Sequence, residues 1–259
     1  PTRRSSDLDG VKRRSSLLSS NQSLPSLMDV SLTTDDQATR SIIKGNLMIP
    51  RSGLWTLDAL LGDDSTLPPV GSQVVLNAYN TTRVGTVIEA GEEYLQLRIR
   101  VIGGAGKLET ALPAQSYSGY TLGDIARDTL SEAGETPNDL SGLNLSTQRW
   151  TRSQGPASSG IRRLINKQRS DGNEIRMYAE KSGAISVRTW NPYVFDSLNS
   201  RYTDLAIWPQ DKEAYIGPDL NTTIEPEQIV SIFDRQVTIV RVLYELQEDV
   251  LRCKVWYEE

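Results

Sequence analysis

The chain has 259 residues, with 33 acidic and 28 basic side chains, no histidine and one cysteine. This length predicts two or three compact units, and the net charge of −5 argues against nonspecific nucleic-acid binding by the outer surface. Without histidine, Ser-His-Asp and Cys-His nucleophiles cannot form, and zinc sites built on imidazole or several thiolates are excluded.

The sequence has no apolar run near the roughly 18 residues that a membrane-spanning helix needs, and no secretory signal at its start. We therefore expect a soluble chain without a membrane-spanning segment. Pro1 is compatible with a natural N-terminus from which the initiator Met was removed.

Residues 1–40 are predicted to form an extended polar arm. The segment is rich in serine and carries basic clusters at Arg3-Arg4 and at Lys12-Arg13-Arg14. Because it has few large apolar side chains, it cannot bury much surface of its own. We expect another chain in a large assembly to order it.

Residues 41–116 are predicted to form an N-terminal β-barrel domain. The clearest strand runs from Tyr94 to Ile102, where Leu95, Leu97, Ile99 and Val101 alternate with polar residues. Short strands separated by turns favour a small closed or half-open barrel. The predicted strands cover 42–49, 53–61, 73–79, 83–89 and 94–102.

Residues 117–215 are predicted to form an α/β insert domain with two helices and a hairpin. Thr121 is the expected N-cap of the first helix, Asp124 completes a capping box, and Gly134 can end the helix. After a polar link, Ser158 or Ser159 is expected to cap a second helix.

Two strands, 174–179 and 184–190, are predicted to follow the second helix. Lys181-Ser182-Gly183 suits the turn of a hairpin between them.

Residues 216–259 are predicted to form a C-terminal β-barrel portion, which strands from 192–228 would complete. Cys253 falls in an alternating strand there, so we expect it to be a buried small side chain. The segment from Ile216 onward has nine acidic and four basic residues, so its net charge of −5 equals that of the whole chain. Such a surface suits solubility, or a conduit that repels a passing polyanion, and we expect Glu245 and Glu248 to line a lumen.

The remaining catalytic chemistry is a carboxylate pair of the kind that cleaves glycosides. Candidate acids are Glu89, Glu92 and Glu93, with the tandem pairs Asp35-Asp36, Asp63-Asp64 and Glu248-Asp249. Acids on turns are usually solvated, and the acids near Ser65 match no ordered calcium loop. The sequence therefore predicts no catalytic residue, no cofactor and no metal ligand.

Two other features invite a functional interpretation. The run from Gly103 to Lys107 fails as a phosphate loop because Leu108 follows the lysine, so a flexible loop is expected. Trp55, Trp190 and Trp256 fall in or beside strands, where aromatic side chains most often pack in a core or an interface.

Four stretches together carry a family resemblance: 46–55, 121–125, 150–152 and 252–258. In order and pattern, the chain from about residue 42 to residue 259 resembles the baseplate hub proteins of tailed bacteriophages. The resemblance implies a mainly β fold with two small barrel-like domains flanking a two-helix and hairpin insert. It also implies a homotrimer whose barrels form a ring between the hexameric tail tube and a trimeric spike.

The first hypothesis is therefore a non-enzymatic structural protein of the virion, located in the phage tail baseplate. Its expected partners are the tail tube protein, the spike protein and other baseplate proteins, and genomic DNA would pass through the lumen without specific binding. The alternatives are a tail-tip adaptor that binds hub or fibres, a tail-associated cell-wall hydrolase acting through carboxylates, and a secreted carbohydrate-binding β protein.

Overall fold

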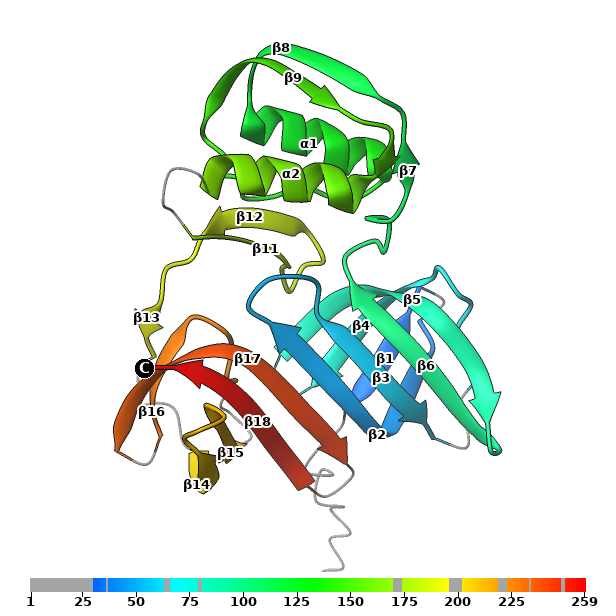
Figure 1. The fold of residues 1–259 in the computed structure, drawn as a ribbon. Coiled ribbons are helices and arrows are strands. Elements are labelled where there is room, and N and C mark those ends of the chain that lie inside the picture. Colours follow the sequence, from blue (N-terminus) through cyan, green and yellow to red (C-terminus); the bar gives the residue numbers. More distant parts are fainter. Residues whose placement is uncertain are drawn as a thin grey trace, which may run out of the picture.

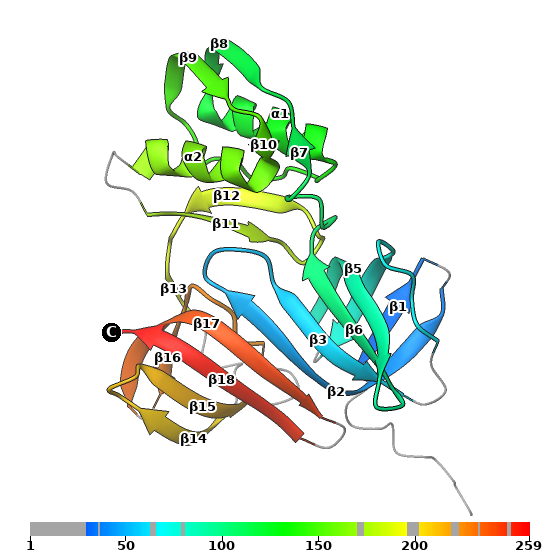
Figure 2. The ribbon, with the colours of Figure 1, turned by 45° about the vertical axis from the view of Figure 1, so that its right-hand side comes forward.

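The structure, a computed structural model, describes residues 30–35, 37–62, 66–78, 81–169, 174–195, 202–218, 223–232, 234–247 and 250–259. Two β units lie side by side, and an insert of helices and short strands sits above them (Figures 1 and 2). The predicted arm lies outside the described residues as far as residue 29.

The first β unit is a closed barrel of six strands. Along the sheet the order is β1-β4-β5-β6-β3-β2, and pairing of β1 with β2 closes it. The strands are β1 (Ser31–Thr34), β2 (Thr39–Pro50), β3 (Thr56–Leu61), β4 (Gln73–Ala78), β5 (Thr81–Glu93) and β6 (Gln96–Gly103).

The barrel includes β1 and the start of β2, which lie within the segment 1–40 that was predicted to be an arm. Val30 and Leu32 are buried in the barrel core, so this short strand supplies a side of the barrel. A run of four residues is too short for alternation to reveal it in the sequence.

One side chain of the predicted strand 94–102 does not reach the core. Ile99 and Val101 are buried, but Leu95 and the neighbouring Tyr94 are at least 90% exposed. Both lie in the β5–β6 turn with positive φ angles of 65° and 50°. The strand begins only at Gln96, so Leu95 belongs to the turn.

The insert combines two helices with three small two-stranded sheets. Its sheets pair β8 with β9, β7 with β10, and β11 with β12. The elements are β7 (Ala111–Leu112), β8 (Gln115–Thr121), α1 (Leu122–Ala133), β9 (Ser146–Arg152), β10 (Gly155–Pro156), α2 (Ala157–Arg169), β11 (Ile175–Ala179) and β12 (Ile185–Thr189).

The two helices begin in different ways. Thr121 and Asp124 form the predicted capping box on α1, and Gly134 ends that helix in the left-handed conformation with φ of 92°. The predicted serine cap of α2 is wrong, because the helix already begins at Ala157. Its first amides donate instead to backbone oxygens: Ala157 to Thr110 at 3.0 Å, and Ser158 to Leu108 at 2.8 Å.

The second β unit is an open sheet in the order β14-β15-β18-β17-β16-β13. Its first strands come from residues 193–218, so the second unit begins where the insert was predicted to continue to residue 215. The strands are β13 (Tyr193–Val194), β14 (Tyr202–Trp208), β15 (Glu213–Pro218), β16 (Gln228–Ile232), β17 (Arg235–Gln247) and β18 (Val250–Glu258).

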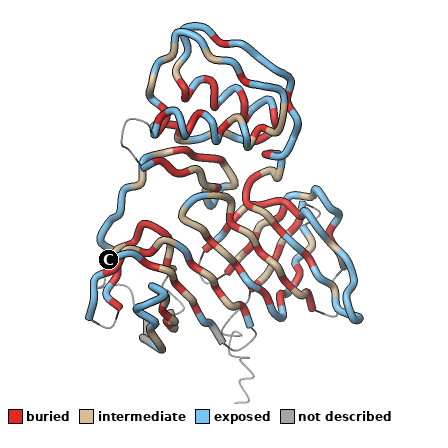
Figure 3. Tube along the Cα trace, in the orientation of Figure 1, coloured by how far each residue is buried: buried red, intermediate tan, exposed pale blue. Residues whose placement is uncertain are grey.

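One sheet continues from the first unit into the second. β17 pairs antiparallel with β2 from Arg241 opposite Pro50 to Gln247 opposite Lys44. Buried residues run through both β units, both helices and the β11–β12 hairpin (Figure 3). Most of them belong to one hydrophobic cluster that spans all three units, so these units are packed against one another.

Candidate functional site at the junction of the three units

A buried carboxylate, Glu227, ties the insert to the second β unit. Its side chain is buried although the residue has a positive φ of 79°, and its N–H donates to Ile239 O at 2.9 Å. Arg176 and Arg188, a cross-strand pair on β11 and β12, both donate to Oε2 of Glu227, the latter at 2.6 Å. The N–H of Asn191 donates to Oε1 at 3.1 Å.

Aromatic rings stack on Arg176 and on the neighbouring Arg51. Arg51 lies 4.1 Å above the ring of Trp190, and Arg176 lies 4.2 Å above the ring of Tyr178. Burial lowers the pKa of Arg176, and the attraction of Glu227 partly offsets this effect. Burial also raises the pKa of Tyr178.

A second carboxylate, Glu225, joins all three units. Arg83 of β5 donates to its Oε1 at 2.9 Å, and Nζ of Lys181, in the turn of the insert hairpin, lies 2.9 Å from the same oxygen. Both ion-pair groups line a cavity of about 470 Å³ at the junction. Residues of all three units line this cavity, which makes it a candidate binding site.

The glycine-rich run 103–107 binds an anion, but that anion belongs to the chain itself. The N–H groups of Ala105 and Lys107 donate to the carboxylate of Glu135 at 2.8 and 2.6 Å. Gly104 and Gly106 have positive φ angles of 86° and 69°, which aim the amides of Ala105 and Lys107 at one acceptor. The expected flexible loop is therefore a fixed contact between the barrel and the end of α1.

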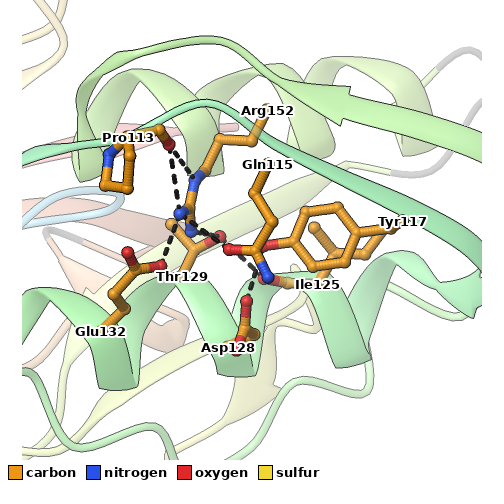
Figure 4. Close-up of polar contacts among 8 residues, drawn as sticks. All are labelled: Pro113, Gln115, Tyr117, Ile125, Asp128, Thr129, Glu132 and Arg152. Carbon is orange, nitrogen blue, oxygen red and sulfur yellow. Dashed lines mark hydrogen bonds and ion pairs between the residues drawn. The ribbon is translucent and has the colours of Figure 1, made fainter.

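A polar cluster inside the insert holds the two-stranded β8–β9 sheet on α1 (Figure 4). The buried guanidinium of Arg152 donates to Glu132 Oε2 at 2.5 Å, to Gln115 Oε1 at 3.0 Å and to Pro113 O at 3.3 Å. Next to it, the hydroxyl of Tyr117 donates to Asp128 at 2.6 Å. Burial and this bond raise the pKa of Tyr117 to about 12. Because these bonds join β8 and β9 to α1, the cluster stabilises the insert.

The predicted candidate acids Glu89, Glu92 and Glu93 line a cavity of about 290 Å³ together with Arg98 and Arg100. Glu89, Glu92 and Glu93 are exposed on the β5–β6 hairpin, where Glu93 pairs with Arg98 at 2.6 Å and Glu89 with Arg100 at 3.5 Å. Of the tandem pairs, only Asp35 lies in the described residues, and it is exposed. Asp36, Asp63, Asp64, Glu248 and Asp249 lie outside them.

The tryptophans and the cysteine take packing positions, as expected. Trp55 is buried in the barrel, Trp190 stacks on Arg51 at the junction, and Nε1 of Trp256 donates to Glu213 at 2.6 Å. Cys253 is fully buried, and burial raises the pKa of its thiol. The predicted lumen acid Glu245 is partly buried and accepts the hydroxyl of Tyr215 at 3.0 Å.

Sequence reasoning missed the junction site. Glu227 lies 51 residues from Arg176 and 39 from Arg188, so no local spacing marks the cluster. Among the described residues, no group of three or more acidic or cysteine side chains could hold a metal ion. Over the same residues, neither helix has the length and apolar character to cross a bilayer.

No protein-family model and no curated protein matches the sequence of the chain. Solved structures do match its fold. The 43 kDa tail protein of prophage MuSo2 from Shewanella oneidensis aligns with a TM-score of 0.65 and 10% identity, over 88% of this chain and 97% of that one. A tail protein from Neisseria meningitidis aligns with a TM-score of 0.61 and 11% identity, over 90% and 96%.

A third similar structure is a type VI secretion system component of E. coli, itself described as similar to the bacteriophage T4 tail proteins gp27 and gp5. It aligns with a TM-score of 0.62 and 10% identity, over 88% of this chain and 77% of that one. The mainly β fold with barrel-like units and a helical insert is therefore confirmed, and the structures that share it are phage tail and tail-like proteins.

Proposed function

We propose that the protein is a structural component of a phage tail: a baseplate hub that forms a ring joining the tail tube to the central spike. The observation that carries the proposal is the fold, which two tail proteins share over 88–90% of this chain. The sheet that runs from β2 into β17 adds to it, because it fixes two β units side by side, as a ring with two units per subunit requires (Figure 2).

The ring would be a homotrimer, and the open second unit supports a contact between copies. Strands β13 and β14 each pair on one side only among the described strands. They carry the exposed apolar side chains Tyr193, Val194, Leu205 and Trp208. Free edges and exposed apolar side chains together favour association with another chain.

The mass in solution tests this proposal most directly. Light scattering over a range of concentrations should approach about three times the 28.8 kDa of one chain. The double change Val194→Lys and Leu205→Lys should shift the equilibrium toward monomer. Tyr120→Lys, at an exposed aromatic of the insert, is the matched control and should leave the mass unchanged. A strict monomer at every concentration would contradict the ring and favour a tail-tip adaptor.

The same proposal assigns a non-enzymatic role in the virion baseplate, with the tube protein, the spike protein and other baseplate proteins as partners and DNA passing through the lumen. Ion pairing of Glu89 and Glu93 with arginines on an exposed hairpin supports this role over carboxylate hydrolysis. Release of fragments from peptidoglycan by the purified protein, abolished by Glu89→Gln or Glu93→Gln, would overturn it.

A further inference from the structure

The junction cavity is lined by both apolar and cationic side chains. Side chains of Ile49, Pro50 and Trp55 line it from the barrel. Four cations line it as well: Arg83 from the barrel, with Arg176, Lys181 and Arg188 from the insert hairpin. A volume of about 470 Å³ is within the range of small-molecule sites in proteins.

The charges that face this cavity do not balance. Glu225 is shared by Arg83 and Lys181, and Glu227 is shared by Arg176 and Arg188. The third acid of the wall, Glu180, is engaged by the insert, because it accepts Ser186 Oγ at 2.5 Å and Asn138 Nδ2 at 2.8 Å. Three carboxylates thus face four cations, so the wall carries one surplus positive charge.

Hydrogen-bond donors are also in excess. The Nε–H groups of Arg83, Arg176 and Arg188 are buried without an acceptor in the described part of the chain. Arg83 and Arg176 are at least 94% buried as whole residues. Buried donors without a partner cost free energy, and a charged acceptor recovers the most.

We propose that this cavity binds a carboxylate carried on a short apolar body. The carboxylate would pair with the guanidinium groups and compensate the surplus charge, and the apolar body would lie against Ile49 and Pro50. A free dicarboxylate and an acidic side chain of a partner protein share this chemistry. Because the wall comes from all three units, an occupant would hold the insert and both β units together.

Titration calorimetry with glutarate tests the proposal on the full chain, with sodium chloride of matched ionic strength as the blank and glutaramide as the uncharged analogue. We expect saturable binding of glutarate alone, and a rise in Tm that follows its concentration. A blocked peptide with adjacent glutamates is the second arm. Tighter binding of glutarate would assign a free ligand, and tighter binding of the peptide would assign a partner side chain.

Two variants locate the binding. Lys181→Gln removes a half-exposed cation from a turn, so this variant should fold, and Arg188→Gln leaves Arg176 to pair with Glu227. Each should weaken glutarate binding at least tenfold, because a hydrogen bond to a charged group contributes that much. Arg100→Gln, on the exposed barrel surface, is the control and should bind as the unchanged protein does.

The result that overturns the proposal is specific. The proposal fails if neither glutarate nor the glutamate peptide binds beyond the sodium chloride blank. It also fails if Lys181→Gln and Arg188→Gln bind glutarate as tightly as the control variant Arg100→Gln. These outcomes are independent of the mass measurement that tests the ring.

Discussion

The first β unit closes on itself, whereas the second stays open, although one sheet runs through both. In the first unit β1 pairs with β4 on one side and β2 on the other, so no edge remains. In the second unit β13 and β14 each have one paired side among the described strands. A closed barrel satisfies its backbone internally, while an open sheet leaves groups that another chain can pair.

The two units also differ in how their ends are held. The end of the barrel is filled by Trp55, which packs beneath a cross-strand pair of glycines, Gly85 and Gly103. A Cβ at Gly85 would lie 2.7 Å from the indole ring, and one at Gly103 would lie 2.5 Å from its Nε1. The second unit is held at its end by polar contacts of Glu227 and Tyr244 instead. The second unit has a hydrophobic core as well, so these hydrogen bonds add to packing at its end.

The largest expected effect comes from removing the side chain that fills the barrel. Trp55→Ala should lower the free energy of unfolding by about 3–5 kcal/mol, because it leaves a cavity in a closed core. Urea denaturation followed by far-UV circular dichroism measures it. Trp208→Ala, at a 43% exposed position of β14, is the matched control and should cost less than about 1 kcal/mol. Equal costs would contradict the contrast between the units.

The packing around Trp55 can also be tested by adding atoms at the glycine pair. Gly85→Ala should destabilise the barrel, because its new methyl group meets the rigid indole ring and the backbone oxygen of Ile102 at 2.5 Å. Gly91→Ala, where an added Cβ meets nothing within 4 Å, should be close to neutral in the same denaturation experiment.

This contrast also explains which elements could be predicted from the sequence. The five longer barrel strands were found because burial alternates along them, as in β3, where Leu57, Ala59 and Leu61 face the core. The start and end of α1 were found because capping residues are local signals.

Elements that depend on distant partners were missed. β8 and β9 bury few side chains, and Tyr117 and Arg152 are the only residues of the pair that are classed as buried. A strand without an apolar face gives no period-2 pattern. The start of α2 depends on the carbonyls of Leu108 and Thr110, and the Glu227 cluster depends on a hairpin 39–51 residues away. Only the folded chain brings these groups together.

A smaller effect tests the polar ties of the second unit. The hydroxyl of Tyr244 donates to Ile224 O and accepts from Ile224 N, both at 2.6 Å, in a buried position. Tyr244→Phe leaves these backbone groups without this partner, so it should cost about 1–3 kcal/mol in the denaturation experiment. Tyr257→Phe is the control, since the buried Tyr257 hydroxyl has no hydrogen-bond partner in the described chain, and its removal should be neutral or stabilising. If packing alone held the second unit, both changes would be neutral.

The smallest effect concerns a surface ion pair of the barrel and its dependence on pH. Two N–H groups of Arg98 donate to Asp58, at 2.9 and 2.6 Å, and this pairing lowers the pKa of Asp58 below its usual value of 3.8. A carboxyl with a lowered folded-state pKa stabilises the fold above its unfolded pKa, and the contribution is lost as pH falls through the folded value. Both side chains are more than a third exposed, so solvent screening limits the contribution to less than about 1 kcal/mol. Asp58→Asn should therefore lower stability slightly at pH 7 and have no effect near pH 2, as measured by Tm across that range. A difference from the unchanged protein that persists at pH 2 would mean that Asp58 acts through packing and not through its charge.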